Sequence, residues 1–355
     1  MSGKLYLRPT GLLWGDAAAV GCREGAALPL AGGPAAFLGV EIIEGAPGSA
    51  TRRLALARDL AASGDAVIQA ALARLTAPRA PVAGVPLDRT RMMGIVNVTP
   101  DSFSDGGDFA NTDTAVAQAR KLVADGGEFI DIGGESTRPG SMEVNEAEEL
   151  RRICPVLEAL QGTGAAISID TRKAAVMEAA VARGAAIIND VSALTYDAGA
   201  LAAAAKTGAA AVLMHAQGDP RSMQDNPVYD DVVLEVYDYL EARVQAAARA
   251  GIPREKLIAD PGIGFGKTLD HNLALLANLS LFHGLGVPVL LGASRKRIIG
   301  SITGRRDPKQ RMPGSLGVAI AGAAQGVQII RVHDVDETRQ ALDVWTASVS
   351  GYGPE

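Results

Sequence analysis

The chain has 355 residues, of which 48% are hydrophobic and 21% are charged, and its formal net charge is −6. Disordered chains combine low hydrophobicity with high net charge, so this composition indicates a folded protein with a sizeable core. The mild acidity argues against a nucleic-acid-binding surface, which needs clustered lysine and arginine, but it leaves room for a small basic pocket.

Cysteine usage and apolar run length narrow the class further. Cys22 and Cys154 are too few and too far apart in sequence for a zinc site or a disulfide framework, so we interpret them as idle thiols. No apolar run reaches the roughly 18 residues of a membrane span, and the first residues lack a basic region followed by a long apolar stretch. We therefore expect a cytoplasmic protein with no membrane or nucleic-acid partner.

The first 87 residues indicate a small α/β unit. KLYLRP and AAFLGVEIIEG are typical of strands, and residues 51–75 predict one or two helices that meet at Gly64. The proline-containing segment 76–90 has the composition of a linker. We predict an N-terminal extension over residues 1–87 whose role the sequence does not assign.

From residue 92 onward, short apolar runs alternate with amphipathic, glycine-punctuated segments. The runs are too continuous for half-exposed strands, which favours strands buried on both faces. Eight runs alternating with helices over residues 88–355 predict a (β/α)8 barrel, a TIM barrel. A doubly wound open sheet is the alternative, but it usually has fewer strands. The eight predicted strands are residues 92–96, 128–132, 166–169, 186–189, 210–214, 256–259, 288–292 and 328–332.

The clearest of the intervening helices is DDVVLEVYDYLEARVQAAARAG, residues 230–251. Its apolar side chains recur at helical spacing, so they should form one buried face. Asp230 and Asp231 suit its N-terminus, while Gly251 and Pro253 should end it. This segment predicts one of the helices that cover the barrel.

Polar side chains follow nearly every predicted strand. Active sites of such barrels lie at the carboxyl ends of the strands, so these side chains should meet at one rim. An idle barrel would place glycine, serine or asparagine there, and helix caps would account for one or two of the others. In chain order they are Asn97, Asp131, Asp170, Asn189 with Asp190, His215, Asp260, Ser294 to Lys296, and Arg331 with His333.

The chemistry of these side chains points to two kinds of ligand. Asp170, Asn189 and Asp260 offer rigid hydrogen-bonding groups that suit a flat heterocycle with N–H groups. Lys296, Arg331 and His333 follow the last two strands, on the side where barrels commonly bind phosphate, and they suggest an anion.

Asn97 and the histidines are open to more than one interpretation. Asn97 could join a hard cation such as Mg²⁺ with phosphate oxygens and water, or it could be a hydrogen-bonded strand end. A lone histidine after an apolar strand is more often structural than catalytic, so we interpret His215 as structural. We place His271 and His283 at the surface.

Two glycine-containing loops border the predicted rim. PGIGFGKT, residues 261–268, lacks the first glycine of a nucleotide-binding phosphate loop because residue 261 is proline. We expect it instead to carry Phe265 and Lys267 over the barrel mouth. GIVNVTPDSFSDGG, residues 94–107, predicts a strand that ends at Asn97 and then a mobile lid carrying Phe103.

Taken in order, the motifs GIVNVTPDSFSDGG, IDIGGESTRPG, SIDT, INDVSA, LMHAQGDP, DPGIGFGKT, GASRKR and RVHDV resemble those of the dihydropteroate synthase family. The resemblance covers roughly residues 90–350. It implies an enzyme that joins p-aminobenzoate to 6-hydroxymethyl-7,8-dihydropterin pyrophosphate, giving 7,8-dihydropteroate and pyrophosphate with Mg²⁺. It also implies a homodimer and inhibition by sulfonamides that compete with p-aminobenzoate.

The resemblance implies a role for each motif residue. Asp170, Asp260, Lys296, Arg331 and His333 would form the catalytic set. The pterin would be bound by Asp170, Asn189, Asp260, Lys296, Phe265 and Gly292, and p-aminobenzoate by Phe103, Thr137, Arg138, Pro139, Phe265 and Ser294. The pyrophosphate would be held by Asn97, Arg138, Arg331 and His333, with Asn97 also on the metal.

One departure and two rival functions accompany this interpretation. Family members commonly carry methionine after the histidine of LMHAQGDP, where this chain has Ala216, so a contact with the pterin face is in doubt. A pterin-dependent methyltransferase of the same barrel superfamily would share Asn189 and Asp260 but would not need the STRPG loop or the Arg331–His333 pair. A non-catalytic pterin-binding barrel would have lost the loop and the anion-binding residues.

Overall fold

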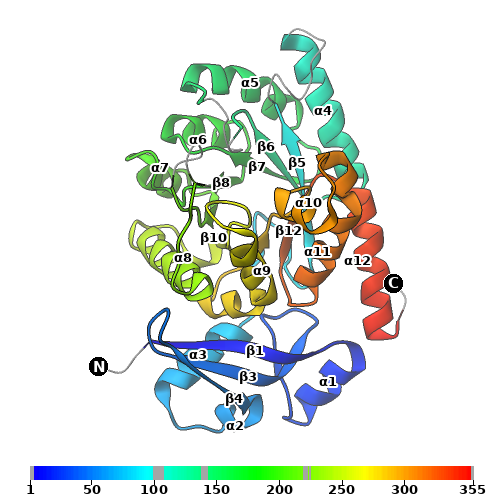
Figure 1. Ribbon diagram of the computed structural model, residues 1–355. Helices are drawn as coiled ribbons and strands as arrows, with labels where there is room; N and C mark the ends of the chain where they lie inside the picture. The colour runs from blue at the N-terminus through cyan, green and yellow to red at the C-terminus, as the bar shows by residue number, and fades with distance from the viewer. Residues whose placement is uncertain (1–3, 99–107, 137–142, 219–222, 224, 353–355) are drawn as a thin grey trace.

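The apolar runs after residue 90 form the strands of one parallel sheet. The computed structural model describes residues 4–98, 108–136, 143–218, 223 and 225–352, and within them this sheet has eight strands in the order β10-β9-β8-β7-β6-β5-β12-β11. A parallel bridge between Ala259 and Val289 joins the two ends of that order, so the sheet closes into the predicted (β/α)8 barrel (Figure 1). The strands are β5 (Arg91–Asn97), β6 (Phe129–Gly133), β7 (Ala166–Asp170), β8 (Ile187–Asp190), β9 (Ala210–Met214), β10 (Leu257–Asp260), β11 (Leu290–Leu291) and β12 (Ile329–Val332).

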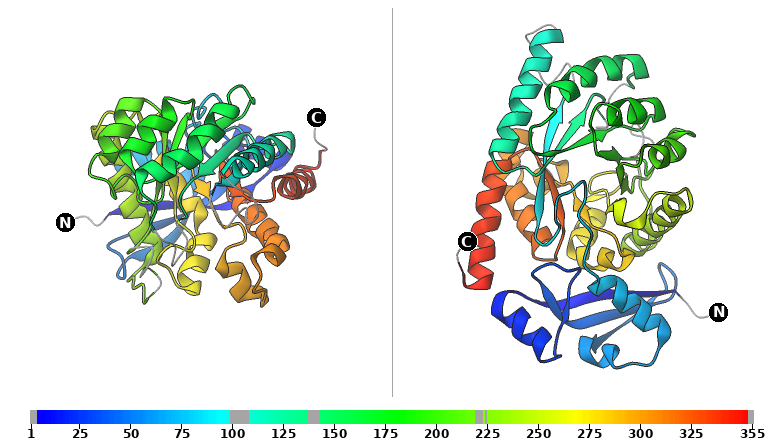
Figure 2. Two further views of the ribbon diagram at one scale, coloured as in Figure 1. Left: turned by 90° about the horizontal axis from the view of Figure 1, so that it is seen from above. Right: turned by 180° about the vertical axis from the view of Figure 1, so that it is seen from behind.

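Helices follow the strands and cover the outside of the barrel (Figure 2). Helix α8 confirms the prediction for residues 230–251: Asp231 caps its first turn through the N–H groups of Val233 and Leu234, and its apolar face is buried. The helices of this part are α4 (Asp108–Ala124), α5 (Glu146–Ala159), α6 (Ala174–Val181), α7 (Ala200–Thr207), α8 (Val232–Arg249), α9 (Leu269–Ala277), α10 (Arg297–Thr303), α11 (Met312–Ala323) and α12 (Val335–Ser350), with 3-10 turns η2 (Arg254–Lys256), η3 (Leu279–Leu285) and η4 (Pro308–Arg311). No helix of the described residues is both long enough and apolar enough to cross a membrane.

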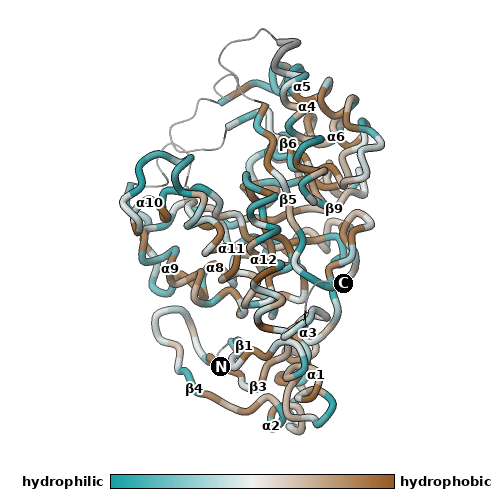
Figure 3. Tube along the Cα trace, turned by 90° about the vertical axis from the view of Figure 1, so that its right-hand side faces the viewer, coloured by the Kyte–Doolittle hydropathy of each residue, from teal (hydrophilic) through white to brown (hydrophobic). Residues whose placement is uncertain are grey.

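The strands divide their side chains between two apolar cores. Alternate residues of a strand face opposite sides of the sheet, so each barrel strand contributes to both the interior and the helix layer. In β6, Phe129 belongs to the interior cluster, whereas Ile130 and Ile132 pack toward the helices with α5 residues such as Val156. Figure 3 shows the hydrophobic colour along these strands, while hydrophilic colour gathers around α10.

Residues 4–76 form a separate layer below the barrel, at the end opposite the carboxyl ends of the strands (Figures 1 and 2). An antiparallel sheet combines β1 (Leu5–Leu13), β2 (Leu28–Pro29), β3 (Ala36–Glu44) and β4 (Thr51–Leu56), with helices α1 (Gly15–Arg23), α2 (Ala57–Ala61) and α3 (Ala66–Thr76). The predicted strands KLYLRP and AAFLGVEIIEG are confirmed. The prediction of helix from residue 51 was wrong, because Thr51–Leu56 pairs with β3 and helix begins only at Ala57.

This layer is fastened to the barrel by buried contacts. The Tyr6 hydroxyl donates to Asp238 of α8 at 2.9 Å, and the Tyr6 ring packs edge-on against Tyr237. Just after this layer, the buried Arg79 donates to the carbonyl of His283 at 2.9 Å. His283 is fully buried, so its predicted surface position was wrong: η3 packs against β1 and α3, a contact that the local sequence does not reveal.

The segment predicted as a linker closes the amino-terminal end of the barrel. Val82 and Leu87 are buried in the interior cluster together with Met93, Phe129 and Ile329, which lie at or near the beginnings of their strands. Val82 is held in a turn by backbone hydrogen bonds with Val85. The segment therefore serves as the floor of the barrel, and the division of the chain at residue 87 stays a prediction.

Candidate active site

The polar residues of the site occupy the layer above the apolar interior. Phe129, Ile187, Ile258 and Ile329 face the barrel interior near the beginnings of their strands. Because side-chain direction repeats every two residues, Asp131, Asn189, Asp260 and Arg331 face the same interior one layer higher. The strand period thus brings these groups together at the carboxyl ends, as the sequence predicted.

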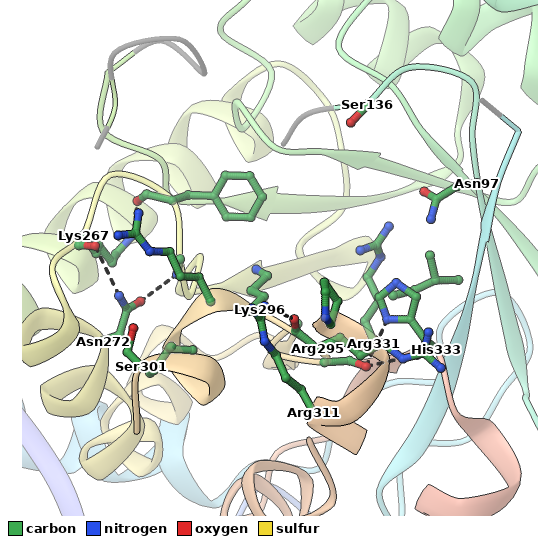
Figure 4. Close-up of a pocket in the computed structure, with 18 of the residues that line it drawn as sticks. Asn97, Ser136, Lys267, Asn272, Arg295, Lys296, Ser301, Arg311, Arg331 and His333 are labelled. Carbon is green, nitrogen blue, oxygen red and sulfur yellow. Dashed lines mark hydrogen bonds between the residues drawn. The ribbon is translucent and has the colours of Figure 1, made fainter. Parts of the chain in front are cut away.

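A cavity of about 760 Å³ opens at this end of the barrel. Of the predicted site residues in the described part of the chain, its walls include Asn97, Asp170, Phe265, Gly292, Ser294, Lys296, Arg331 and His333 (Figure 4). Asn189 is buried beside this wall, in register with Asp170 on the neighbouring strand. A side chain at Gly292 would begin 3.7 Å from Oδ2 of Asp260, so the glycine leaves space beside this buried carboxylate. Phe103, Thr137, Arg138 and Pro139 lie outside the described residues.

Arg331 occupies the centre of the polar layer. Its Nε donates to Oδ2 of Asp131 at 2.6 Å and its Nη2 donates to Oδ2 of Asp170 at 3.0 Å. The amide of Asn189 donates to the same oxygen of Asp131 at 2.9 Å. Within the described residues, the buried Oδ1 atoms of Asp131 and Asp170 have no hydrogen-bond partner. Of these two carboxylates only Asp170 lines the cavity, so it presents an oxygen that a donor-rich ligand can use.

Burial sets the charges of these groups. It raises the pKa of Asp170 to about 7, with Arg331 opposing the rise and Asp131 adding to it. Burial also lowers the pKa of Lys296 to about 8, although Asp260 opposes the fall, and it raises the pKa of Asp260 against the influence of Lys296. Burial lowers the pKa of Arg331 too, but Asp131 and Asp170 outweigh it, and the net shift is upward. The site thus combines carboxylate acceptors with cationic side chains whose pKa values depend on the neighbouring charges.

Lys296 and Phe265 form one side of the cavity. The Lys296 ammonium lies 4.3 Å from the centroid of the Phe265 ring, a cation–π distance, and it also donates to the carbonyl of Ile263. Ser294 and His333, which also line the cavity, form a pair: Oγ of Ser294 lies 3.0 Å from Nδ1 of His333 and accepts from its backbone N–H at 3.2 Å. A residue predicted for p-aminobenzoate thus contacts one predicted for pyrophosphate.

Lys267 lines the cavity, as predicted for its loop, but its ammonium does not extend over the mouth. Its ammonium is buried and turned into its own loop, where it donates to the carbonyls of Gly262 and Phe265, each at 2.9 Å. The Gly262 backbone packs against the His215 carbonyl, where a Cβ atom would lie 1.8 Å from the carbonyl oxygen. Its φ of +70° also favours glycine at this position. Lys267 therefore holds the glycine-rich loop in shape.

His215 is structural, as the sequence favoured. Its Nδ1 lies 2.9 Å from the Lys267 ammonium, and its ring packs edge-on against Tyr239. Burial, with Lys267 beside it, lowers the pKa of His215 to about 2, so the ring is neutral at physiological pH.

Sequence reasoning placed Asp131 at the rim but gave it no role. The structure makes it the fully buried partner of Arg331 and Asn189. Asp131 lies two residues after Phe129 in β6 and therefore faces the same side of the sheet. This spacing could have identified it as an interior group. Groups of three or more histidine, cysteine, aspartate or glutamate side chains that could hold a metal do not occur among the described residues.

Comparisons with known proteins agree on one family. The family model described as pterin binding enzyme matches residues 93–333. The chain is 49% identical over 265 residues to dihydropteroate synthase of Escherichia coli K12, covering 74% of this chain and 93% of that protein. Two solved dihydropteroate synthases are similar, each with a TM-score of 0.72. That of Yersinia pestis, in a sulfonamide complex, is 47% identical and covers 77% of this chain and 99% of its own. That of Xanthomonas albilineans, with 4-aminobenzoic acid, is 51% identical and covers 76% and 98%.

Proposed function

The chain belongs to the dihydropteroate synthase family of pterin-binding enzymes, and from this premise we propose how its barrel carries out the reaction. The enzyme condenses 6-hydroxymethyl-7,8-dihydropterin pyrophosphate with p-aminobenzoate in folate synthesis, releasing 7,8-dihydropteroate and pyrophosphate. The observation that carries the residue assignment is the shared cavity. Asp170, with an unpaired buried oxygen, lines the same space as Lys296, Arg331 and His333.

The pterin subsite consists of Asp170, Asn189, Asp260, Lys296, Phe265 and Gly292. Asp170 and Asp260 accept hydrogen bonds from the N–H groups of the pterin ring, because both are carboxylates held at strand ends. Lys296 is a donor for a ring carbonyl or ring nitrogen. Gly292 keeps the space beside Asp260 open, which suits a flat ring.

The p-aminobenzoate subsite combines Ser294 and Phe265 with Phe103, Thr137, Arg138 and Pro139 of the two loops outside the described residues. Ser294 supports this assignment through its position on the cavity wall beside His333. Because the amine attacks the carbon from which pyrophosphate departs, the amine and pyrophosphate subsites must adjoin, and the Ser294–His333 contact fits that requirement.

The pyrophosphate subsite consists of Asn97, Arg138, Arg331 and His333. Arg331 uses two of its N–H donors on Asp131 and Asp170, and a guanidinium carries about five, so donors remain for an anion. The residues present also fit Mg²⁺, because Asn97 brings an amide to the cavity wall and Mg²⁺ keeps several waters and phosphate oxygens around few protein ligands. When bound, Mg²⁺ would neutralise charge on the pyrophosphate oxygens.

The reaction proceeds by early departure of pyrophosphate. The bond between the pterin methylene carbon and the pyrophosphate oxygen breaks, positive charge develops on the pterin, and the aniline nitrogen then forms the new bond and releases its proton. Arg331 and His333 stabilise the leaving anion, while Asp170 and Asp260 stabilise the cationic ring. No enzyme nucleophile takes part.

Three assignments beyond the site complete the proposal. We assign residues 1–87 a supporting role, because their layer contacts the barrel at the end opposite the cavity. We also propose a homodimer and a cytoplasmic location. The free thiols Cys22 and Cys154 fit a reducing compartment. Light scattering of the purified protein tests the homodimer, and a monomer at micromolar concentration would contradict it.

The decisive experiment supplies both substrates. The protein is incubated with the pterin pyrophosphate, p-aminobenzoate and Mg²⁺, and both products are measured. Dihydropteroate and pyrophosphate should form in equal amounts. A parallel reaction with EDTA tests the metal and should lose most of the rate. Absence of product with substrates that another synthase converts would refute the function, whereas full rate in EDTA would refute only the role of Mg²⁺.

A further inference from the structure

Within the described residues, β10 and β11 form the least extensively paired junction of the barrel. The other neighbouring strands pair over two to five residues, whereas β10 and β11 meet through the single bridge between Ala259 and Val289. We refer to this junction as the seam. Segments with few stabilising contacts open locally more often than the rest of a fold, so closure of the seam depends on the elements packed against it.

The carboxyl end of the seam carries much of the pterin subsite proposed above. Asp260 ends β10 and Gly292 follows β11, and a Cβ atom at Gly292 would lie 3.7 Å from Oδ2 of Asp260. Lys296 donates to the carbonyl of Ile263, which links the chain after β11 to the chain after β10. A change in the spacing of the two strands would therefore move Asp260 relative to Lys296.

The amino end of the seam is held by arginine side chains that bind η3. This 3-10 helix precedes β11, and its last three residues offer consecutive backbone carbonyls, those of His283, Gly284 and Leu285. Arg79 donates to the first carbonyl at 2.9 Å, Arg74 donates to the second at 2.8 Å, and Arg254 donates to the third. Guanidinium groups suit this place because carbonyls at the end of a helical segment carry partial negative charge.

The three arginines tie together segments that are far apart in the chain. Arg254 belongs to η2, directly before β10, so its bond to η3 joins the elements that lead into the two strands of the seam. Arg74 belongs to α3 of the N-terminal layer, residues 4–76, which lies beneath this end of the barrel (Figure 1). Arg79 follows that layer and also donates to the carbonyl of Arg74 at 3.0 Å. Ser280 of η3 adds a contact by donating to the carbonyl of Pro9 in β1 at 3.0 Å.

Arg79 is the most buried of these arginines. It is 9% exposed, and no carboxylate of the described residues pairs with it. Burial and the nearby Arg254 lower the pKa of Arg79 to about 10, so the side chain stays protonated at neutral pH. A buried charge is costly unless hydrogen bonds compensate it. The compensating acceptors are the backbone carbonyls of Arg74, Ala77 and His283, so the charge is satisfied only while α3 and η3 stay together.

We propose that the N-terminal layer, through Arg79, clamps the seam and so positions the pterin subsite. The inference rests on the proposed function for the identity of the ligand. Six residues separate η3 from Gly292, so a shift of η3 reaches the site through one short strand. Without the Arg79 guanidinium, η3 loses this contact with the layer, β11 separates from β10 more often, and Lys296 moves away from Asp260. Asp170 and Asn189 keep their places because β7 and β8 pair with each other away from the seam.

Amide hydrogen exchange tests the clamp without any ligand. In Arg79→Met, the amides of β10 and β11 should exchange about tenfold faster, while those of β7 and β8 keep their wild-type rates. The matched control is Arg52→Met, which removes an arginine of the same layer that binds Asp231 of α8 at 3.0 Å, and it should leave the seam unchanged. Equal exchange in wild type and Arg79→Met, or equally faster exchange in all four strands, would overturn the clamp.

Calorimetric titration with 6-hydroxymethylpterin tests the effect on the site. This pterin carries no pyrophosphate, so its Kd reports the pterin subsite. We expect Arg79→Met to raise that Kd about three- to tenfold, while Arg52→Met binds like the wild type. Arg79→Lys keeps the charge but loses the planar fork of donors, so it should recover part of the affinity. A wild-type Kd in Arg79→Met would overturn the positioning role, even if the seam exchanged faster.

A second variant covers the case in which Arg79→Met does not fold. Arg74 is only partly buried, so Arg74→Met removes the bond to the Gly284 carbonyl and leaves the acceptors of Arg79 in place. We expect the same pattern with about twofold changes in seam exchange and in Kd. Unchanged exchange of β10 and β11 in this variant would overturn the clamp. Failure of the wild type to bind 6-hydroxymethylpterin would instead refute the proposed function, and because the exchange experiment needs no ligand, the two failures are distinguishable.

Discussion

Replacing Arg331 by methionine should destabilise the whole barrel, since the guanidinium is the cation between two buried carboxylates. Asp131 is 0% exposed and Asp170 is 8% exposed, and once Arg331 is gone the two negative charges face each other without it. Removing one partner of a buried ion pair lowers the free energy of unfolding by about 3–5 kcal/mol. The unfolding entropy of a 355-residue chain is roughly 0.75 kcal/mol per kelvin, so Tm should fall by about 4–7 °C.

The pH dependence of this loss identifies its cause. Burial raises the pKa of Asp170 from 3.8 to about 7 in the folded protein, and removal of Arg331 takes away an influence that lowers it. A carboxyl with a raised folded pKa destabilises the protein fully above that pKa, and the cost declines as the pH falls from the folded pKa toward the unfolded value of 3.8. The Tm deficit of Arg331→Met should therefore be smaller at about pH 5.5 than at about pH 8.

Differential scanning calorimetry of wild type, Arg331→Met and the double variant Arg331→Met/Asp131→Asn measures the effect. Asparagine removes one of the two unpaired charges and keeps the shape, so the double variant should recover about half of the lost Tm. If Arg331→Met melts like the wild type, or if its deficit does not change with pH, the guanidinium does not stabilise the barrel by compensating these carboxylates. The same variant is expected to weaken pterin binding as well as pyrophosphate binding, because Arg331 also orients Asp170.

Four other outcomes test the site and the fold. Asp260→Asn should weaken binding of 6-hydroxymethylpterin about tenfold or more in calorimetric titration, because a charged acceptor is lost; wild-type affinity would contradict the acceptor role. Pterin affinity of the wild type, followed by fluorescence, should rise with pH up to about 7 and then level off, since the ionised Asp170 carboxylate is a stronger acceptor than the protonated one. Sulfonamides should raise KM for p-aminobenzoate without lowering kcat, whereas inhibition independent of p-aminobenzoate would place them elsewhere. Leu87→Ala, at the barrel floor, should cost about 2–5 kcal/mol of stability and lower Tm while leaving kcat intact, and a loss of kcat at unchanged Tm would contradict its structural role.

The sequence by itself determined the barrel and most of its polar rim. Apolar runs such as AAVLM, bounded by glycine-containing helix segments, are local signals, because a strand buried on both faces must be apolar along its length. The ends of those runs then place Asp170, Asn189, Asp260 and Arg331 at one rim, since all strands of a parallel barrel end on the same side. The ordered motifs added the family.

Only the tertiary structure decided which of these groups contact one another. Arg331 and Asp131 are 200 residues apart in the chain, and their contact depends on β12 and β6 flanking β5 in the closed sheet. Burial of His283 likewise follows from β1 and α3, which pack against η3 from elsewhere in the chain, whereas Lys267 is buried within its own loop and against His215. The strand Thr51–Leu56 forms because β3 has an edge to pair with, although its composition predicts helix. Local patterns report whether a residue is buried, and the partner that compensates a buried charge is chosen by packing between distant segments.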